Sequence, residues 1–224
     1  MFNTPQYIEI ENYIKEKIYS NDFKIGDKLP SERELAHTFG VGRPTVREAI
    51  LSLEIQGLLN SVQGKGTFIC NQIKDNMTKS LSHITNISNI DIIKIVEYRE
   101  MFEYSTVRLA AKNGTDEEID VLKEILDGME IMTDPQNMKK MDSKFHEQIS
   151  LMSHNELIST TFYSMRHFFE ESIDASVMRV LLHDESIVLY HKFIYESIRN
   201  RDGNAAYMFM QKHMQKVYDV LERE

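Results

Sequence analysis

Four side chains in the C-terminal half of the sequence have the types and the spacing of a metal site. Asp142 and His146 are four residues apart, so both lie on one face of a predicted helix. His191 lies roughly eleven residues before a helical turn predicted at residues 201–204, and His213 about ten residues after it. With a rise of about 1.5 Å per residue, the two imidazoles reach a similar height on neighbouring antiparallel helices. Asp142 and His146 alone are more typical of a surface pair or of a satisfied pair inside a bundle. If their helix packs against this helical hairpin, the core holds one carboxylate and three imidazoles, which suit Zn²⁺, with Ni²⁺, Fe²⁺ and Mn²⁺ as alternatives.

The same donors raise the alternative of a metal-dependent enzyme with an accessory winged-helix domain. Di-iron bundles use Glu-x-x-His motifs, but the positions three residues before the three histidines hold Ser, Val and Met. Zinc proteases need His-Glu-x-x-His on one helix, and Ser150 stands where the second His belongs. Neither template fits, so we predict that the protein is not an enzyme. A further alternative is a winged helix used for protein contact, with an empty structural cluster of histidines.

A second set of residues has the pattern of a nucleic-acid contact. In "GVGRPTVREAI", Arg43 and Arg47 follow a Gly-Val-Gly turn and share one face of a helix. The opposite face carries Val46, Ile50 and Leu53. Two short helices joined by a glycine-containing turn are typical of a helix-turn-helix, whose second helix enters the DNA major groove. An arginine there can pair with guanine or clamp a phosphate.

The alternative interpretation is that both arginines are ordinary solvent-exposed surface charges. Arg43 could pair with Glu48 and Arg47 with Glu54, which is how most charged residues on helices behave. The surrounding elements favour the DNA interpretation, because they add the other parts of a winged helix.

The elements that must position the arginines are predicted within the first 72 residues. Apolar residues recur at three- and four-residue steps from Gln6 to Ser20, which predicts a helix. Ser31 and Glu34 form a capping box that starts a second helix, and the third runs from Arg43-Pro44 to Gly57. The stretch "LLNSVQGKGTFIC" predicts a β-hairpin. Residues 1–72 are therefore predicted to form a winged helix-turn-helix.

The rest of the chain is predicted to be entirely helical. Residues 73–90 are polar, and we expect a linker or a first short helix there. Residues 91–224 contain a long periodic helix, then a capping box at Thr115 and Glu118, then helices near 137–152, 156–173, 184–200 and 204–224. The predicted fold class is mainly α, a winged helix followed by an all-α helical bundle.

Composition limits the class of protein. The 224 residues carry a net charge of -9, of which -1 falls in residues 1–75 and -8 in the remainder, so non-specific coating of nucleic acid is disfavoured. No apolar run approaches the roughly 20 residues that cross a bilayer, and Cys70 is the single cysteine. We expect a cytoplasmic protein without a membrane partner.

The stretch from Leu29 to Phe68, "LPSERELAHTFGVGRPTVREAILSLEIQGLLNSVQGKGTF", resembles the winged-helix domain of the GntR family of bacterial transcription regulators. The resemblance implies DNA contacts from Arg33 to the backbone, from Arg43, Thr45 and Arg47 to the operator, and from Gly64 and Lys65 at the wing tip. Gly42 stands where the family more often has Ser or Thr, a change that costs only a few tenths of a kcal/mol at an N-cap.

The stretches "VEYREMFEYSTVRLAA" and "FHEQISLMSHNEL" resemble the FCD ligand-binding domain of the FadR subfamily. In its metal-binding members an Asp and three His hold one ion, and Asp142, His146, His191 and His213 match all four positions. The resemblance also implies that Arg99 faces an effector pocket, although its neighbours Glu97 and Glu100 would equally suit a surface charge. A ligand-responsive repressor is therefore expected, with a small organic acid as effector. A homodimer on two-fold related operator half-sites is expected as well.

Overall fold

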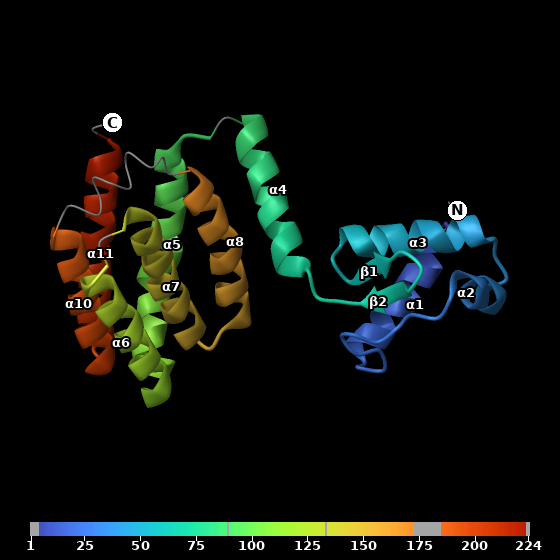
Figure 1. Ribbon diagram of the computed structural model, residues 1–224, viewed down its shortest axis with the longest axis horizontal. Helices are drawn as coiled ribbons and strands as arrows, with labels where there is room; N and C mark the ends of the chain where they lie inside the picture. Colours follow the sequence, from blue (N-terminus) through green and yellow to red (C-terminus); the bar gives the residue numbers. More distant parts are fainter. Residues whose placement is uncertain (1–4, 89, 133, 173–184, 223–224) are drawn as a thin grey trace. The chain divides into compact units, whose positions relative to one another are not determined.

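The computed structural model of the chain describes residues 5–88, 90–132, 134–172 and 185–222 (Figure 1). The chain divides into two compact units, Met1–Lys79 and Ser80–Glu224. His183, the predicted helix start at residue 184 and the side chain of His167 lie outside the described residues. The predicted fold class is confirmed, because a three-helix and hairpin unit precedes a unit built of helices.

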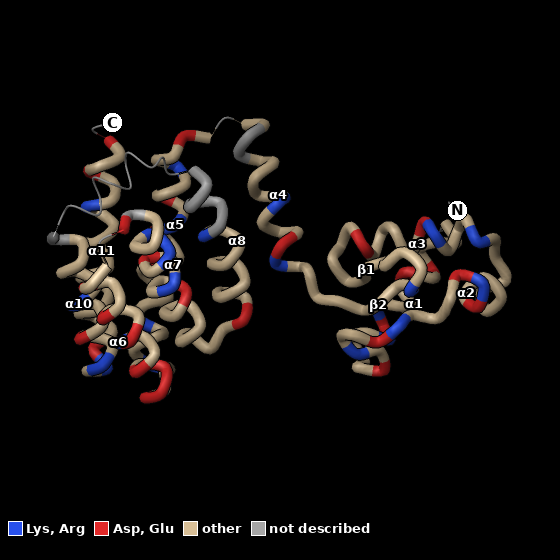
Figure 2. The backbone as a smooth tube through the Cα atoms, viewed as in Figure 1, with Lys and Arg blue, Asp and Glu red and all other residues tan. Residues whose placement is uncertain are grey.

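The first unit consists of three helices and a two-stranded antiparallel hairpin. Helix α1 spans Gln6–Tyr19, α2 spans Glu32–Phe39 and α3 spans Arg43–Ile55, and strands β1 (Leu59–Val62) and β2 (Gly66–Ile69) pair with Leu59 opposite Ile69. The predicted capping box of α2 is present. The core contains Ile10, Ile14, Leu35, Val46, Ala49, Leu53 and Leu59. Figure 2 shows that helices α2 and α3 carry both basic and acidic residues.

The turn of the hairpin depends on two glycines. Gly64 (φ +75°) and Gly66 (φ +113°) both adopt backbone conformations that favour glycine. A Cβ on Gly66 would lie 2.5 Å from the side-chain Cε of Lys28. Lys28 forms an isolated antiparallel β-bridge with Phe68 of β2. A Cβ on Gly64 would meet no atom within 4 Å, so the tip of the wing stands clear of the rest of this unit.

The second unit is a bundle of helices. Residues 73–88, within the range where a linker or first short helix is expected, form α4 (Ile73–Ser88), and the boundary between the two units falls within this helix. The bundle proper follows as α5 (Ile92–Asn113), α6 (Asp116–Glu130), α7 (Pro135–Met152), α8 (Glu156–Ser172), α10 (Glu185–Arg199) and α11 (Gly203–Leu221). Helix α5 packs against α7, α8 and α11, and α10 packs against α11. The core includes Val96, Val107, Leu122, Phe145, Ile149, Ile194 and Met214. Within the described residues, every helix is too short or too polar to span a bilayer.

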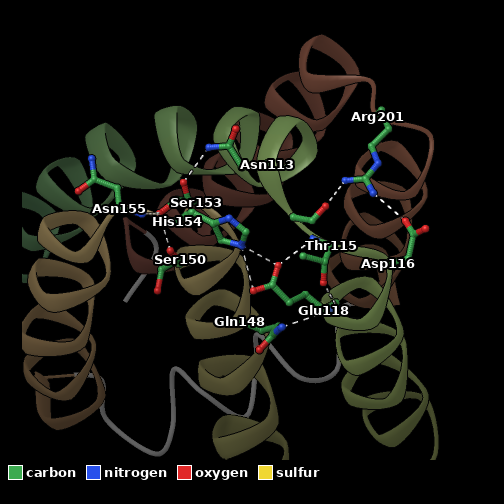
Figure 3. A network of polar contacts seen from close by, with 11 residues as sticks. Asn113, Thr115, Asp116, Glu118, Gln148, Ser150, Ser153, His154, Asn155 and Arg201 are labelled. Atoms are coloured by element: carbon green, nitrogen blue, oxygen red, sulfur yellow. Dashed lines mark hydrogen bonds and ion pairs between the residues drawn. The ribbon is translucent and has the colours of Figure 1, made fainter.

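A polar network ties three turns together at one end of the bundle (Figure 3). Glu118 completes the predicted capping box of α6 and also meets Nε2 of His154, at the end of α7, at 2.9 Å. Arg201, in the α10–α11 turn, donates hydrogen bonds to the carbonyl of Gly114 and to Asp116. These contacts join the start of α6 to the end of α7 and to the α10–α11 turn.

Candidate functional site

The four predicted metal ligands converge inside the bundle. Asp142 and His146 come from α7, His191 from α10 and His213 from α11, and one donor atom from each lies within 4.8 Å of the others. His191 Nε2 is 3.1 Å from Asp142 Oδ1 and 3.4 Å from His146 Nε2. Ligands bound about 2 Å from one ion are about 3 to 4 Å apart, so the two spacings from His191 Nε2 fit a single central cation.

Burial and charge also match a metal centre. The three histidines are at most 1% exposed, and burial lowers the pKa of His213 well below its ordinary value. Burial also lowers the pKa of His191, although Asp142 opposes this shift. Burial would raise the pKa of Asp142, but the hydrogen bond from His191 and the neighbouring positive charges hold it well below its ordinary value. The lowered pKa values of His191, His213 and Asp142 favour two neutral imidazoles and an ionised carboxylate, which are the forms that bind metals.

The close approach of two ring nitrogens supports the same interpretation. Nε2 of His146 and Nε2 of His191 are 3.4 Å apart in a fully buried position. Each can act as a lone-pair donor toward a cation, which would satisfy both at once. The residues present therefore fit a divalent metal ion.

Glu103 of α5 is a functional candidate that the sequence analysis did not identify. It is 1% exposed, and its Oε1 lies 2.8 Å from Arg99 Nε and 2.9 Å from His146 Nδ1. The His146 contact has hydrogen-bonding length, although the N–H direction is off the line to the oxygen. Burial raises the pKa of Glu103, but His146 and Arg99 outweigh it, so the net pKa is lowered. The four-residue spacing of Arg99 and Glu103 was the available sequence signal.

Arg99 is buried rather than a surface charge flanked by Glu97 and Glu100. It is 7% exposed and lines a cavity of about 10 Å³, which is room for about one water molecule. The other lining residues are Ile95, Ser143, Phe162, Met165 and Arg166. Arg99 contacts Glu103, which in turn contacts the metal-ligand candidate His146, so one buried carboxylate links the lining of the cavity to the candidate metal centre.

The candidate nucleic-acid interface places Arg43 and Arg47 together at the start of α3. Their side chains are 58% and 61% exposed, and both contact the carboxylate of Glu32 on α2, at 3.1 Å and 2.9 Å. The observed partner of both arginines is therefore Glu32, whereas the sequence analysis considered Glu48 for Arg43 and Glu54 for Arg47. The hydrogen bond from Arg47 is the largest cause of the lowered pKa of Glu32. An exposed ion pair of this kind contributes little stability, so a duplex can displace it.

The remaining predicted DNA contacts lie on the same elements. Arg33 is exposed on α2, Thr45 is half-buried in the first turn of α3, and Gly64 and Lys65 are exposed at the tip of the hairpin. Gly42 is the N-cap of α3 and provides no side-chain hydrogen bond there, as its lack of a side chain requires. Arg33, Arg43 and Arg47 are thus carried by two consecutive helices, with a separate basic residue on the wing.

Two family models match the chain. The model described as bacterial regulatory proteins, gntR family, matches residues 6–69, and the FCD domain model matches residues 94–216. Among curated proteins, the chain is similar to the HTH-type transcriptional repressor NanR of Klebsiella aerogenes, with 29% identity covering 93% of the chain and 82% of the relative. It is also similar to the HTH-type transcriptional regulator LutR of Bacillus subtilis, with 29% identity covering 91% and 95%. These relatives are named as regulators and not as enzymes.

A solved structure shows the same arrangement of elements. The chain matches Streptococcus agalactiae GntR with a TM-score of 0.77 and 25% sequence identity, over 95% of this chain and 99% of that one. The match therefore includes residues of both the hairpin-bearing unit and the helical bundle, as the two family-model matches do together.

Proposed function

Because the chain belongs to the GntR family of bacterial regulators and carries an FCD domain, we propose that it is a homodimeric repressor of the FadR subfamily whose helical unit binds a divalent metal ion and a small carboxylate. The coarser function, a ligand-responsive DNA-binding transcriptional regulator, follows from the family. The proposed binding of a metal ion and an effector by the helical unit rests on the convergence of Asp142, His146, His191 and His213 in the bundle.

The DNA-binding half uses the exposed residues of α2, α3 and the wing. Arg43, Thr45 and Arg47 enter the major groove, Arg33 binds the backbone, and Gly64 and Lys65 approach the duplex at the wing. What supports these roles is the exposure of the arginines and the open space at the hairpin tip. A two-fold operator would be read by a homodimer, with one winged helix on each half-site.

Glu32 provides the first test of this interface. Replacing Glu32 by Gln is expected to strengthen binding to a non-operator duplex about two- to fivefold at low salt, because it removes a negative charge that competes with phosphates for Arg43 and Arg47. Fluorescence anisotropy measures the affinity. Glu16→Gln, an exposed change on α1, is the matched control and should leave the affinity unchanged. Weaker binding by Glu32→Gln would show that the carboxylate aligns the arginines for DNA instead.

The metal-binding half holds the ion through Asp142, His146, His191 and His213, with Zn²⁺ as the first choice and Ni²⁺, Fe²⁺ and Mn²⁺ as alternatives. A bound ion supplies positive charge and open coordination positions for a carboxylate. The cavity that Arg99 lines has room for about one water molecule, so its side chains must move apart for Arg99 to add a guanidinium to the same ligand. Binding of the effector then shifts the balance between two arrangements of the DNA-binding units, which changes the affinity for the operator.

Effector binding gives the second test. Acetate, lactate and gluconate serve as probes, and at least one is expected to raise the melting temperature of the metal-loaded protein while leaving the metal-stripped protein unchanged. Arg99→Lys keeps a positive charge beside Glu103 but loses the guanidinium, so it should weaken that binding about tenfold or more. Isothermal titration measures both affinities. Equal stabilisation of stripped and loaded protein would remove the metal from the effector site.

A further inference from the structure

Glu103 lies between the candidate metal centre and the candidate effector cavity. One oxygen atom, Oε1, is 2.8 Å from Arg99 Nε and 2.9 Å from His146 Nδ1. Arg99 lines the cavity, and His146 directs its opposite ring nitrogen, Nε2, toward Asp142 and His191. A single buried carboxylate therefore contacts both parts of the site from α5, a helix that supplies none of the four ligands.

We propose that Glu103 is a positioning residue of the metal centre, which holds His146 in the tautomer that presents Nε2 to the ion and holds Arg99 at the cavity. This inference rests on the proposed function. A neutral imidazole carries its hydrogen on one nitrogen only, and a carboxylate beside Nδ1 favours the hydrogen there. The lone pair then remains on Nε2. The negative charge also raises the basicity of the imidazole as a ligand.

The structure separates this role from that of an ordinary ion pair. A buried carboxylate requires a charged partner, and Arg99, four residues earlier on the same helix, already supplies one. The same oxygen nevertheless reaches His146 on α7. Within the described residues, the Nδ1 atoms of His146, His191 and His213 are all buried without a hydrogen bond of ordinary geometry, but that of His146 lies 2.9 Å from Glu103 Oε1, so His146 is the ligand whose orientation Glu103 can set.

Zinc affinity tests the proposal in the full-length protein. Glu103→Gln keeps the shape of the side chain and removes its charge, and it is expected to weaken Zn²⁺ binding about 10- to 100-fold. Competition with a chromophoric chelator measures the affinity. Thr106→Val is the matched control, because Thr106 lies on the same helix, is 2% exposed and has a hydroxyl without a hydrogen-bond partner in the described structure. The control should stay within about threefold of the unmodified protein.

A second measurement needs no variant of Glu103. Long-range ¹H–¹⁵N spectra of the zinc-loaded protein, with His146→Gln used to assign the signals, should show the His146 hydrogen on Nδ1 and the metal on Nε2. The reverse arrangement would overturn the proposal, as would zinc affinities within threefold for Glu103→Gln and the unmodified protein. Failure of the unmodified protein to take up zinc would instead overturn the proposed metal function, and the role of Glu103 with it.

Discussion

Replacing His191 by alanine is expected to abolish the stabilisation of the protein by metal. His191 is central to the cluster, because its Nε2 is 3.1 Å from Asp142 Oδ1 and 3.4 Å from His146 Nε2. With free metal at about 1,000 times its dissociation constant, binding adds about 4.1 kcal/mol to the free energy of unfolding. A variant that binds about 1,000-fold more weakly would keep only about 0.4 kcal/mol of this gain.

Thermal unfolding with and without Zn²⁺ measures the difference. For a protein of this size each kcal/mol moves the melting temperature by roughly 2–4 °C, so a shift on the order of 10 °C should disappear in the variant. His154→Ala is the matched control, since it removes a half-exposed imidazole from the same unit. This imidazole contacts Glu118 and not the histidine cluster. An unchanged response of His191→Ala would remove His191 from the site.

Elemental analysis completes this experiment. Protein purified without chelator and without nickel resin should contain close to one metal ion per chain, because the four donors surround one position. The identity of the metal is read from the same measurement. Metal-free protein that also fails to respond to added Zn²⁺, Ni²⁺, Fe²⁺ or Mn²⁺ would favour an empty structural cluster of histidines.

Replacing Arg43 and Arg47 together by alanine is expected to lower the affinity for the operator at least about 100-fold. A well-placed arginine contributes about 1–3 kcal/mol to base discrimination, and two such contacts lie side by side at the start of α3. The operator is first obtained by in vitro selection with the unmodified protein. Electrophoretic mobility shift assays against the selected and a scrambled duplex then measure affinity and specificity.

A charge-matched control separates sequence recognition from general electrostatics. Lys17→Ala with Lys24→Ala removes the same charge from α1 and the turn that follows it, outside α2, α3 and the wing. That control is expected to change operator affinity only a few-fold. Retained specific binding by the double arginine variant would contradict the proposed interface. A uniform loss on both duplexes would assign the arginines to phosphates instead of bases.

The candidate DNA-binding and metal-binding residues differ in how strongly they are coupled to the stability of the protein. The arginines of α3 are exposed and held by one displaceable carboxylate, so their replacement affects DNA binding with little effect on stability. Of the candidate metal ligands, the three histidines are buried among core side chains such as Phe145, whose ring packs 4.8 Å from that of His191. Metal binding is therefore coupled to the stability of the bundle, which is why thermal unfolding reports on it.

Features that depend on local spacing could be predicted from the amino-acid sequence alone. Helical periodicity and the capping boxes at Ser31 and Thr115 predicted where helices begin, because these signals involve residues within one turn of each other. The constant rise of a helix predicted that His191 and His213 would meet, since both are counted from the same turn. The fold class followed from the same local signals.

Contacts between side chains on separate helices could not be predicted in this way, and they are known from the tertiary structure. Glu103 and His146 are on α5 and α7, and Glu32 reaches Arg43 and Arg47 from α2. The period of a helix shows which face a residue occupies, but packing sets the rotation of that face toward its neighbour and the rotamer that bridges the gap. For that reason the four candidate ligands could be proposed from the sequence, while the carboxylate that contacts one of them could not.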